Sequence, residues 1–150
     1  MVVLNGRFTG KKAVVVRVYD EGSKERKFGH VLIAGIERYP RKITKATVGK
    51  ALERKSRVKP FVKFVNYSHI MPTRYNIESV LAEKLRDSLA SDEALVADDS
   101  AGRSDGKKEA LQNIKKIFQS RYKELGEPAK GSTVSTTTTG ALYFFRKLKF

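Results

Sequence analysis

The sequence contains no cysteine, and this absence excludes disulfide bonds and thiolate metal sites. No apolar run approaches the roughly 18 residues that a membrane-spanning helix needs, and no cleavable signal segment opens the chain. Only two histidines are present, His30 and His69, and neither lies in a His-Glu-x-x-His metal-binding pattern. We therefore expect a soluble intracellular protein with no metal site, no cofactor, no small-molecule substrate, no membrane contact and no enzymatic activity.

The glycine-rich segment GRFTGKK, residues 6–12, lacks the features of a nucleotide-binding P-loop. A P-loop has four residues between its glycines and a Ser or Thr after the lysine, because that hydroxyl holds magnesium. Here three residues separate Gly6 from Gly10, and Lys12 stands where the hydroxyl residue belongs. The segment instead predicts a glycine-rich hairpin turn with two surface lysines, Lys11 and Lys12.

Acidic residues are scarce in the first half of the chain. The formal net charge is +15, and residues 1–75 hold 18 Lys/Arg against 5 Asp/Glu. Residues 38–63 carry ten basic residues and one acidic residue, whereas residues 76–106 carry three basic and eight acidic residues. A surface that only maintains solubility mixes its charges, so this segregation favours a face that binds a polyanion.

The basic stretch carries the strongest functional signal in the sequence. Lysine and arginine pair with phosphates and release condensed counterions, which makes nucleic-acid binding strongly salt-dependent. A solubilising face and a nuclear-targeting tract are the alternatives, but neither requires charges of opposite sign to be segregated. The residues predicted to contact phosphate here are Arg38, Arg41, Lys42, Lys45, Lys50, Arg54, Lys55, Arg57 and Lys59, with Tyr39 beside them.

Four short segments predict strands. Residues 2–19 indicate two strands around the glycine turn, because apolar residues alternate in the second of them. Residues 31–36 are apolar without interruption and predict a central strand, which Pro40 ends. Residues 60–67 predict a fourth strand. Strands at such close spacing suggest a small barrel or rolled sheet, with residues 45–55 forming either a short helix or an irregular loop.

The spacing of the apolar residues changes after residue 76. Apolar residues at helical spacing predict one helix over residues 77–89 and a second over residues 111–122, which Gly126 and Pro128 end. Residues 132–139 form a threonine-rich tract that predicts a mobile segment. The final ten residues, ALYFFRKLKF, predict a strand or an anchored tail.

His69 lies among aromatic and basic residues in the segment NYSHIMPTRY, residues 66–75. Unstacked RNA bases bind to such groups through stacking and cation–π contacts. The alternative is a turn whose aromatic rings pack against one another. For His30, which opens an apolar strand, a structural role is the default.

Several blocks of the sequence resemble one family. VVLNGRFTGKKAVVVRVYDEG, residues 2–22, is similar to a KOW motif, an RNA-associated segment of SH3-like barrels. The blocks GRFTGKKAVVV, GHVLIAGIERYPRKIT, VKPFVKFVNYSHIMPTRYN and the terminal FFRKLKF together resemble the eukaryotic-type large-subunit ribosomal protein twenty-seven family. A KOW motif alone is weak, but four blocks in the right order are specific.

The resemblance implies a structural, non-catalytic protein of the large subunit of the cytoplasmic ribosome, assembled in the nucleolus and bound to ribosomal RNA and neighbouring ribosomal proteins. It implies a mainly β fold with α additions: a small SH3-like β-barrel with a long basic loop, one or two C-terminal helices and an extended tail. Residues 1–78 would form the barrel, including the loop 38–60, and residues 79–150 the helical extension.

The same resemblance carries RNA contacts onto matching positions of this chain. Besides the residues after the third strand, these are Arg7, Lys11, Lys12, His69, Thr73, Arg74, Tyr75, Arg146, Lys147 and Lys149. The acidic segment 87–106 and the threonine-rich tract depart from the family pattern, and the acidic segment is expected to point away from RNA. A KOW-type accessory factor of transcription or ribosome assembly is the alternative function.

Overall fold

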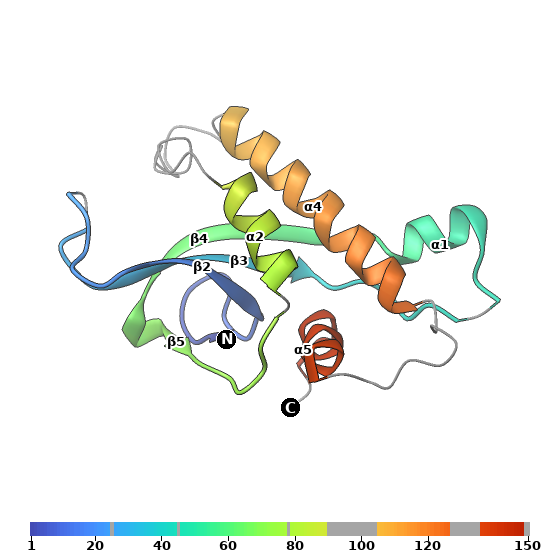
Figure 1. Cartoon of the computed structure of the whole chain (residues 1–150), viewed down its shortest axis with the longest axis horizontal. Coiled ribbons are helices and arrows are strands. Elements are labelled where there is room, and N and C mark those ends of the chain that lie inside the picture. Colours follow the sequence, from blue (N-terminus) through green and yellow to red (C-terminus); the bar gives the residue numbers. More distant parts are fainter. Residues whose placement is uncertain (25, 45, 78, 90–104, 127–135, 149–150) are drawn as a thin grey trace.

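A three-stranded antiparallel sheet forms the centre of the molecule (Figure 1). The computed structural model describes the whole chain except residues 25, 45, 78, 90–104, 127–135 and 149–150. The strands β2 (Ala13–Tyr19), β3 (His30–Arg38) and β4 (Lys59–Asn66) follow the order β2-β3-β4. The predicted strands and the central position of β3 are confirmed.

Strand β3 is buried on both faces, which explains its uninterrupted apolar sequence. Leu32, Ala34 and Ile36 point into the larger core, which the helices complete. Val31 and Ile33 point into a smaller core on the other face of the sheet. The strand ends two residues before Pro40, as the sequence predicts.

A second ladder joins the first and the last strand of the sheet region. Strand β1 (Val2–Val3) pairs with β5 (Ile70–Met71), and a single bridge joins Val2 to Lys12 next to β2. A short 3-10 helix, η1 (Tyr67–His69), leads from β4 into β5. The segment after β1 is the expected tight turn, because Gly6 and Gly10 both adopt positive φ angles that favour glycine.

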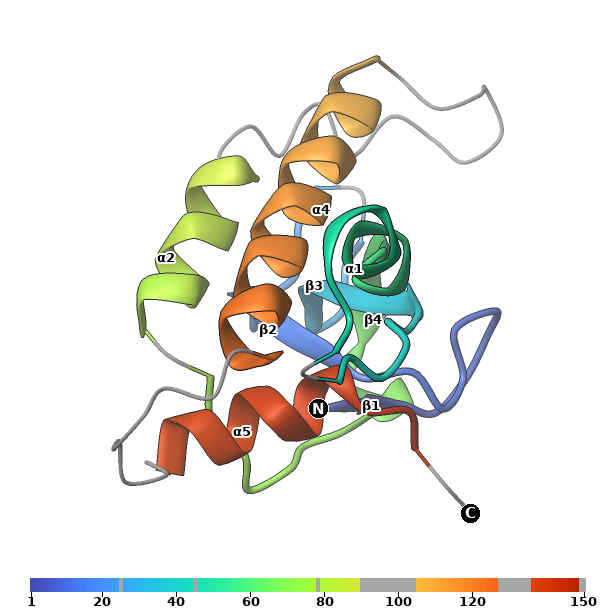
Figure 2. The ribbon, with the colours of Figure 1, turned by 90° about the vertical axis from the view of Figure 1, so that its right-hand side faces the viewer.

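Four helices surround the sheet in the described part of the chain: α1 (Gly49–Lys55), α2 (Ser79–Ser88), α4 (Asp105–Gly126) and α5 (Thr136–Phe145). In Figure 2, α2 and α4 lie side by side against the sheet, and α5 crosses below them. The helices predicted after residue 76 are therefore confirmed, and a helix forms within residues 45–55.

The larger core joins the sheet to these helices. Leu85 of α2 and Phe118 of α4 are fully buried in the same cluster as Leu32 and Ile36 of β3. From α5, Phe144 adds its ring, with a centroid 5.3 Å from that of Phe118. Burial of such side chains contributes about 1.5–3 kcal/mol each relative to exposure, so the helices are part of the folded unit.

The expected proportions of helix and strand are wrong. Among the described residues, helices contain more residues than strands, so the fold is α+β rather than mainly β. The strands form two separate ladders, and no closed barrel is present among them. Residues 90–104 of the predicted acidic segment 87–106 and residues 132–135 of the threonine-rich tract 132–139 lie outside the described residues.

Of the C-terminal segment, residues 141–145 belong to a helix and not to the predicted strand, residues 146–148 have no regular secondary structure, and buried side chains anchor the segment as the other alternative stated. Its aromatic run has high strand propensity, but Ala141, Phe144 and Phe145 are buried at helical spacing and share one face. Packing of that face against α4 outweighs the local preference. Residues 136–139 of the threonine-rich tract also belong to this helix, so they are ordered rather than mobile.

Gly35 leaves no room for a side chain in the middle of β3. A Cβ atom at this position would lie 2.5 Å from Cζ of Phe61 and 2.8 Å from the carbonyl oxygen of Lys12. We expect Gly35→Ala to lower the free energy of unfolding by about 2–3 kcal/mol, as overpacking of a dense core does. Urea denaturation followed by circular dichroism measures this loss, and an unchanged midpoint would contradict it.

Candidate nucleic-acid interface

The backbone of Arg41 is held in place from two sides. Its N–H donates to the carbonyl oxygen of Lys55 at 2.9 Å, and its own carbonyl oxygen accepts from the hydroxyl of Tyr122 at 2.8 Å. The side chains of Arg41 and Lys42 are exposed. The predicted basic residues therefore leave the sheet from a fixed position and extend into solvent.

Helix α1 and its flanks present a second group of cations. The side chains of Lys50, Arg54 and Arg57 are exposed, so all three can reach a ligand. The ammonium of Lys55 donates to Thr47 Oγ1 at 3.2 Å and stabilises the preceding turn. Lys59 forms a surface ion pair with Glu37 at 2.8 Å, which is weak in water and can be exchanged for a phosphate.

Lys12 is buried, with only 2% of its surface exposed, and its position does not support the predicted phosphate contact. Its ammonium donates to the carbonyl oxygens of Tyr143 and Arg146 at 2.6 and 2.8 Å and lies 3.5 Å from the Tyr143 ring centroid. These carbonyls lie at the C-terminal end of α5, where a cation is favoured. Burial, together with the charge of Arg146, lowers the pKa of Lys12 to about 8.

Two predicted RNA-facing tyrosines also make internal contacts. The hydroxyl of Tyr39 accepts the backbone N–H of Lys12 at 2.9 Å, and burial raises the pKa of Tyr39. Tyr75 stacks on Tyr143 with a centroid distance of 4.0 Å. Tyr75 therefore packs on a ring of α5, and not on the other aromatic rings of its own segment as the alternative stated. We call Lys12, Tyr39, Tyr75, Tyr143 and Arg146 the Lys12 cluster.

The Lys12 cluster brings together four segments that are distant in sequence: the first turn, the end of β3, residues 73–75 and the end of α5. Cations lie around it. The ammonium of Lys11 is 5.8 Å from the ring centroid of Tyr39, and the guanidinium of Arg74 is 5.3 Å from that of Tyr75. Four of the segments that the sequence marks as RNA contacts therefore meet in the folded chain.

The remaining predicted residues vary in exposure. Arg7, Arg38, His69, Arg146 and Lys147 are exposed, and Thr73 is half-buried. His69 lies apart from the Lys12 cluster contacts, with Nε2 3.5 Å from Nδ2 of Asn5. Lys45 and Lys149 fall outside the described residues.

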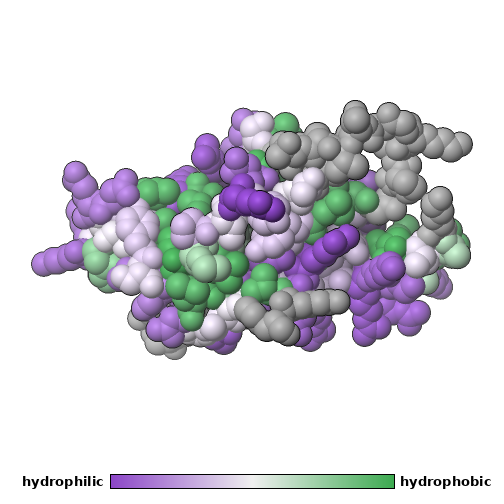
Figure 3. Space-filling view, turned by 90° about the horizontal axis from the view of Figure 1, so that it is seen from below, coloured by the Kyte–Doolittle hydropathy of each residue, from purple (hydrophilic) through white to green (hydrophobic). Residues whose placement is uncertain are grey.

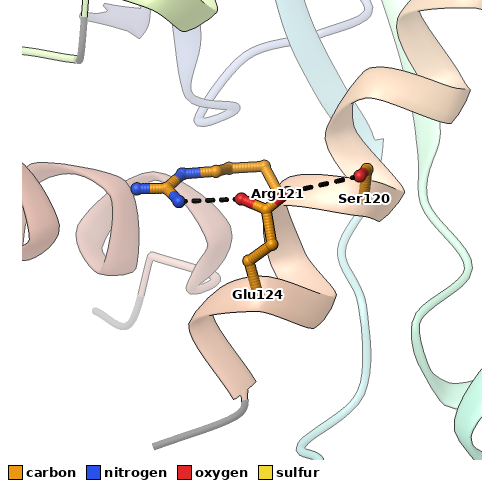
Figure 4. Close-up of polar contacts among 3 residues, drawn as sticks. All are labelled: Ser120, Arg121 and Glu124. Carbon is orange, nitrogen blue, oxygen red and sulfur yellow. Dashed lines mark hydrogen bonds and ion pairs between the residues drawn. The ribbon is translucent and has the colours of Figure 1, made fainter. Parts of the chain in front are cut away.

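The sequence interpretation missed two cations on α4. Lys115 and Lys123, with Gln119 between them, line a hollow of about 260 Å³ together with Arg57 and Glu53. Lys115, Gln119 and Lys123 follow one another at intervals of four residues, which puts them on one helix face. This spacing is the signal in the sequence that identifies the two lysines. Arg121 on the same helix differs, because Glu124 pairs with it at 2.9 Å and Ser120 also contacts Glu124 (Figure 4).

Two further classes of site have no support within the described ranges. No group of three or more histidine, cysteine, aspartate or glutamate side chains is placed to hold a metal ion there. No helix in that part of the chain has the length and apolar character needed to cross a membrane.

Comparison with known proteins identifies the family. The family model of the Ribosomal L27e protein family matches residues 1–131. The chain belongs to the ribosomal L27e family. It is 39% identical over 150 residues to the large ribosomal subunit protein eL27 of Tetrahymena thermophila, covering 100% of this chain and 93% of that protein.

Further members of the L27e family give the same result. The chain is 41% identical over 121 residues to eL27A of Schizosaccharomyces pombe, covering 81% of this chain and 82% of that protein. It is 37% identical over 150 residues to eL27z of Arabidopsis thaliana, covering 100% and 93%. The family predicted from the sequence blocks is therefore confirmed.

One face of this L27e family member is uneven in polarity. Figure 3 shows hydrophilic side chains at both ends of the face, over the β2–β3 hairpin at one end and around α1 at the other. Hydrophobic residues lie between them. Single hydrophilic side chains also lie among the hydrophobic ones on this face.

Proposed function

We propose that this protein is a structural constituent of the large subunit of the cytoplasmic ribosome, where it binds and stabilises ribosomal RNA. The observation that supports this most directly is its membership of a family whose relatives are named large ribosomal subunit proteins. The role is non-catalytic and needs no cofactor. The net charge of +15 and the exposed cations on fixed backbone positions are consistent with binding to phosphates.

The proposed RNA-contact surface consists of side chains that can reach a ligand. Lys12 is left out, because its ammonium is engaged inside the protein. Tyr39 and Tyr75 are proposed to hold Lys11 and Arg74 beside the RNA. The cations proposed to contact phosphate are Arg7, Lys11, Arg38, Arg41, Lys42, Lys50, Arg54, Arg57, Lys59, Arg74, Arg146 and Lys147, with Lys115 and Lys123 added from α4.

The ladders suggest how the strands relate to an SH3-like fold. Because β1 pairs with β5 and bridges to Lys12, the strand order β5-β1-β2-β3-β4 can be followed through both ladders. We propose that this is an open, rolled form of the SH3-like sheet of KOW proteins. In this proposal residues 1–78 provide most of the RNA contacts, and residues 79–150 support this unit and add Lys115, Lys123, Arg146 and Lys147.

The proposed location follows from the proposed role. The protein would be assembled into the large subunit in the nucleolus and would then remain in cytoplasmic ribosomes, in contact with neighbouring ribosomal proteins. Sedimentation of cell lysates through sucrose gradients tests this: we expect the protein in large-subunit, monosome and polysome fractions after a wash in moderate salt. Its presence in light fractions alone would contradict the proposal and favour a transient accessory factor.

Replacing both Arg41 and Lys42 with alanine tests the contact surface. Each neutralised phosphate contributes about 0.7–0.9 to the slope of log K against log salt concentration, so we expect the slope to flatten by about one to two. Affinity at low salt should also fall. Titrations of ribosomal RNA fragments by fluorescence anisotropy at several salt concentrations measure both quantities.

Asp98→Ala combined with Asp99→Ala is the control for this experiment. These residues lie in the acidic segment that is predicted to point away from RNA. Their removal should leave both the affinity and the salt slope nearly unaltered. If the Arg41 and Lys42 variant kept the wild-type slope, those two residues would not be phosphate contacts.

A further inference from the structure

A hollow of about 360 Å³ lies at one end of the sheet, where three parts of the chain meet. The first turn contributes Asn5, the β2–β3 hairpin contributes Arg26 and Phe28, and the end of β4 with η1 contributes Lys63, Phe64 and His69. The volume is in the lower part of the range of about 300–1,000 Å³ for ligand sites in proteins. Of this set, only His69 is a residue that the sequence marks as a contact.

Aromatic rings that pack against the buried His30 form the wall of the hollow. His30 is buried, and its Nδ1 lies 2.8 Å from the carbonyl oxygen of Phe28. The rings of Phe28 and Phe64 meet this imidazole edge-on, with centroid distances of 5.8 and 5.7 Å. Phe28 is 48% exposed, so a flat group can lie against a ring whose position is already determined.

Cationic groups lie next to this aromatic wall. The guanidinium of Arg26 is 4.6 Å from the ring centroid of Phe64, and Lys63 is exposed on β4. None of the residues described as lining the hollow is acidic. A negatively charged group is therefore attracted to the same place where a flat ring can stack.

The rim supplies polar groups that can distinguish a base edge. The amide of Asn5 lies 3.5 Å from the imidazole of His69, and both side chains are exposed. The Oδ1 of Asn5 accepts the backbone N–H of Gly6 at 2.7 Å and keeps a second lone pair, so the amide still offers a donor and an acceptor to the hydrogen-bonding edge of a base. Base-paired RNA hides its rings inside the stack, so only a base that has left the helix can use this wall.

We propose that this hollow binds a single unstacked RNA nucleotide, with its base against Phe28, its edge at Asn5 and its phosphate near Lys63 and Arg26. This inference rests on the proposed function, because it takes RNA as the partner. It adds a mode of recognition: the cations around the Lys12 cluster and α1 contact backbone phosphates, whereas the hollow selects RNA with an unpaired base.

The test compares two RNAs and two variants of the full-length protein. The probes are a short single-stranded RNA that carries 2-aminopurine, whose fluorescence falls when it stacks, and a blunt duplex of equal phosphate number. Phe28→Ala removes the exposed ring, and Lys63→Gln removes a charge from an exposed position. Val18→Ala is the matched control, because Val18 is 54% exposed on β2 and does not line the hollow.

We expect Phe28→Ala to weaken binding of the single strand by about 5- to 100-fold and to abolish the quenching of 2-aminopurine, because stacking of one base contributes in this range. Duplex affinity should not change. Lys63→Gln should weaken single-strand binding and lower its salt slope by about 0.7. Val18→Ala should behave as the wild type for both probes.

The outcomes separate this inference from the proposed function. The nucleotide site would be overturned if Phe28→Ala, Lys63→Gln and the wild type all bound the single strand with equal affinity while duplex binding stayed intact. The proposed function would then still stand. Failure of the wild-type protein to bind either RNA would overturn both. Circular dichroism of Phe28→Ala verifies its fold, and Lys63→Gln tests the site without altering the aromatic wall.

Discussion

Replacing Phe118 with alanine is expected to lower the free energy of unfolding by about 3–5 kcal/mol, the usual cost of removing a buried aromatic ring. Phe118 has no exposed surface and lies in the larger core. Its ring meets those of Phe144 and Phe145 edge-on, with centroid distances of 5.3 and 6.2 Å. Its removal would leave a cavity between α4, α5 and the sheet, and these rings could not close it without moving α5.

Urea denaturation measures this effect. The chain contains six tyrosines and no tryptophan, so circular dichroism and tyrosine fluorescence are the suitable signals. Val80→Ala is the control, because Val80 also lies in a helix but is 56% exposed, and its loss should stay within about 0.5 kcal/mol. A loss below 1 kcal/mol for Phe118→Ala would show that α5 does not pack on α4 as described.

Gly140→Ala is expected to destabilise the protein although alanine is the better helix former. In an exposed helix this substitution gains about 1 kcal/mol. At Gly140, however, a Cβ atom would clash with the carbonyl oxygen of Asn76, and its distance to the Asn76 carbonyl carbon would be 3.2 Å. Because backbone atoms cannot rotate out of the way, α5 must move, and we expect a net loss of about 2–3 kcal/mol.

Hydrogen exchange of the α5 amides follows this displacement directly. They should exchange faster in Gly140→Ala, while the amides of β3 keep their protection. Gly106→Ala is the matched control, since Gly106 is an exposed glycine at the beginning of α4, and it should be neutral or stabilising. Equal stability of the Gly140 variant and the wild type would mean that α5 does not cross Asn76 so closely.

The parts of the fold that were predicted correctly are those determined by local pattern. Residues 31–36 are apolar without a break because β3 is buried on both faces, and α4 has a regular apolar stripe that includes Ile114 and Phe118. The C-terminal helix was mispredicted because its aromatic residues favour a strand until they pack on α4. Neither the open arrangement of the ladders nor the contact that selects helix for α5 can be deduced from short windows.

The candidate interface, too, could be predicted only in part from the sequence. Charge segregation and the sequence blocks indicated the segments that meet around the Lys12 cluster. They could not distinguish Lys11, which is half-buried beside a ring, from Lys12, which is buried below α5. Likewise, the pairing of Tyr75 with Tyr143 depends on the fold, because these residues are far apart in the chain. Burial of a cation or an aromatic ring is a property of tertiary structure.

The buried ammonium of Lys12 has a consequence for the order in which the chain folds. Its acceptors are the carbonyl oxygens of Tyr143 and Arg146, which follow it by 131 and 134 residues. Because synthesis proceeds from the N-terminus, the ammonium of Lys12 cannot reach these acceptors until α5 has been made. The backbone hydrogen bonds of the first turn are local, so the turn itself can form early, whereas the side chain of Lys12 reaches its final contacts only together with α5.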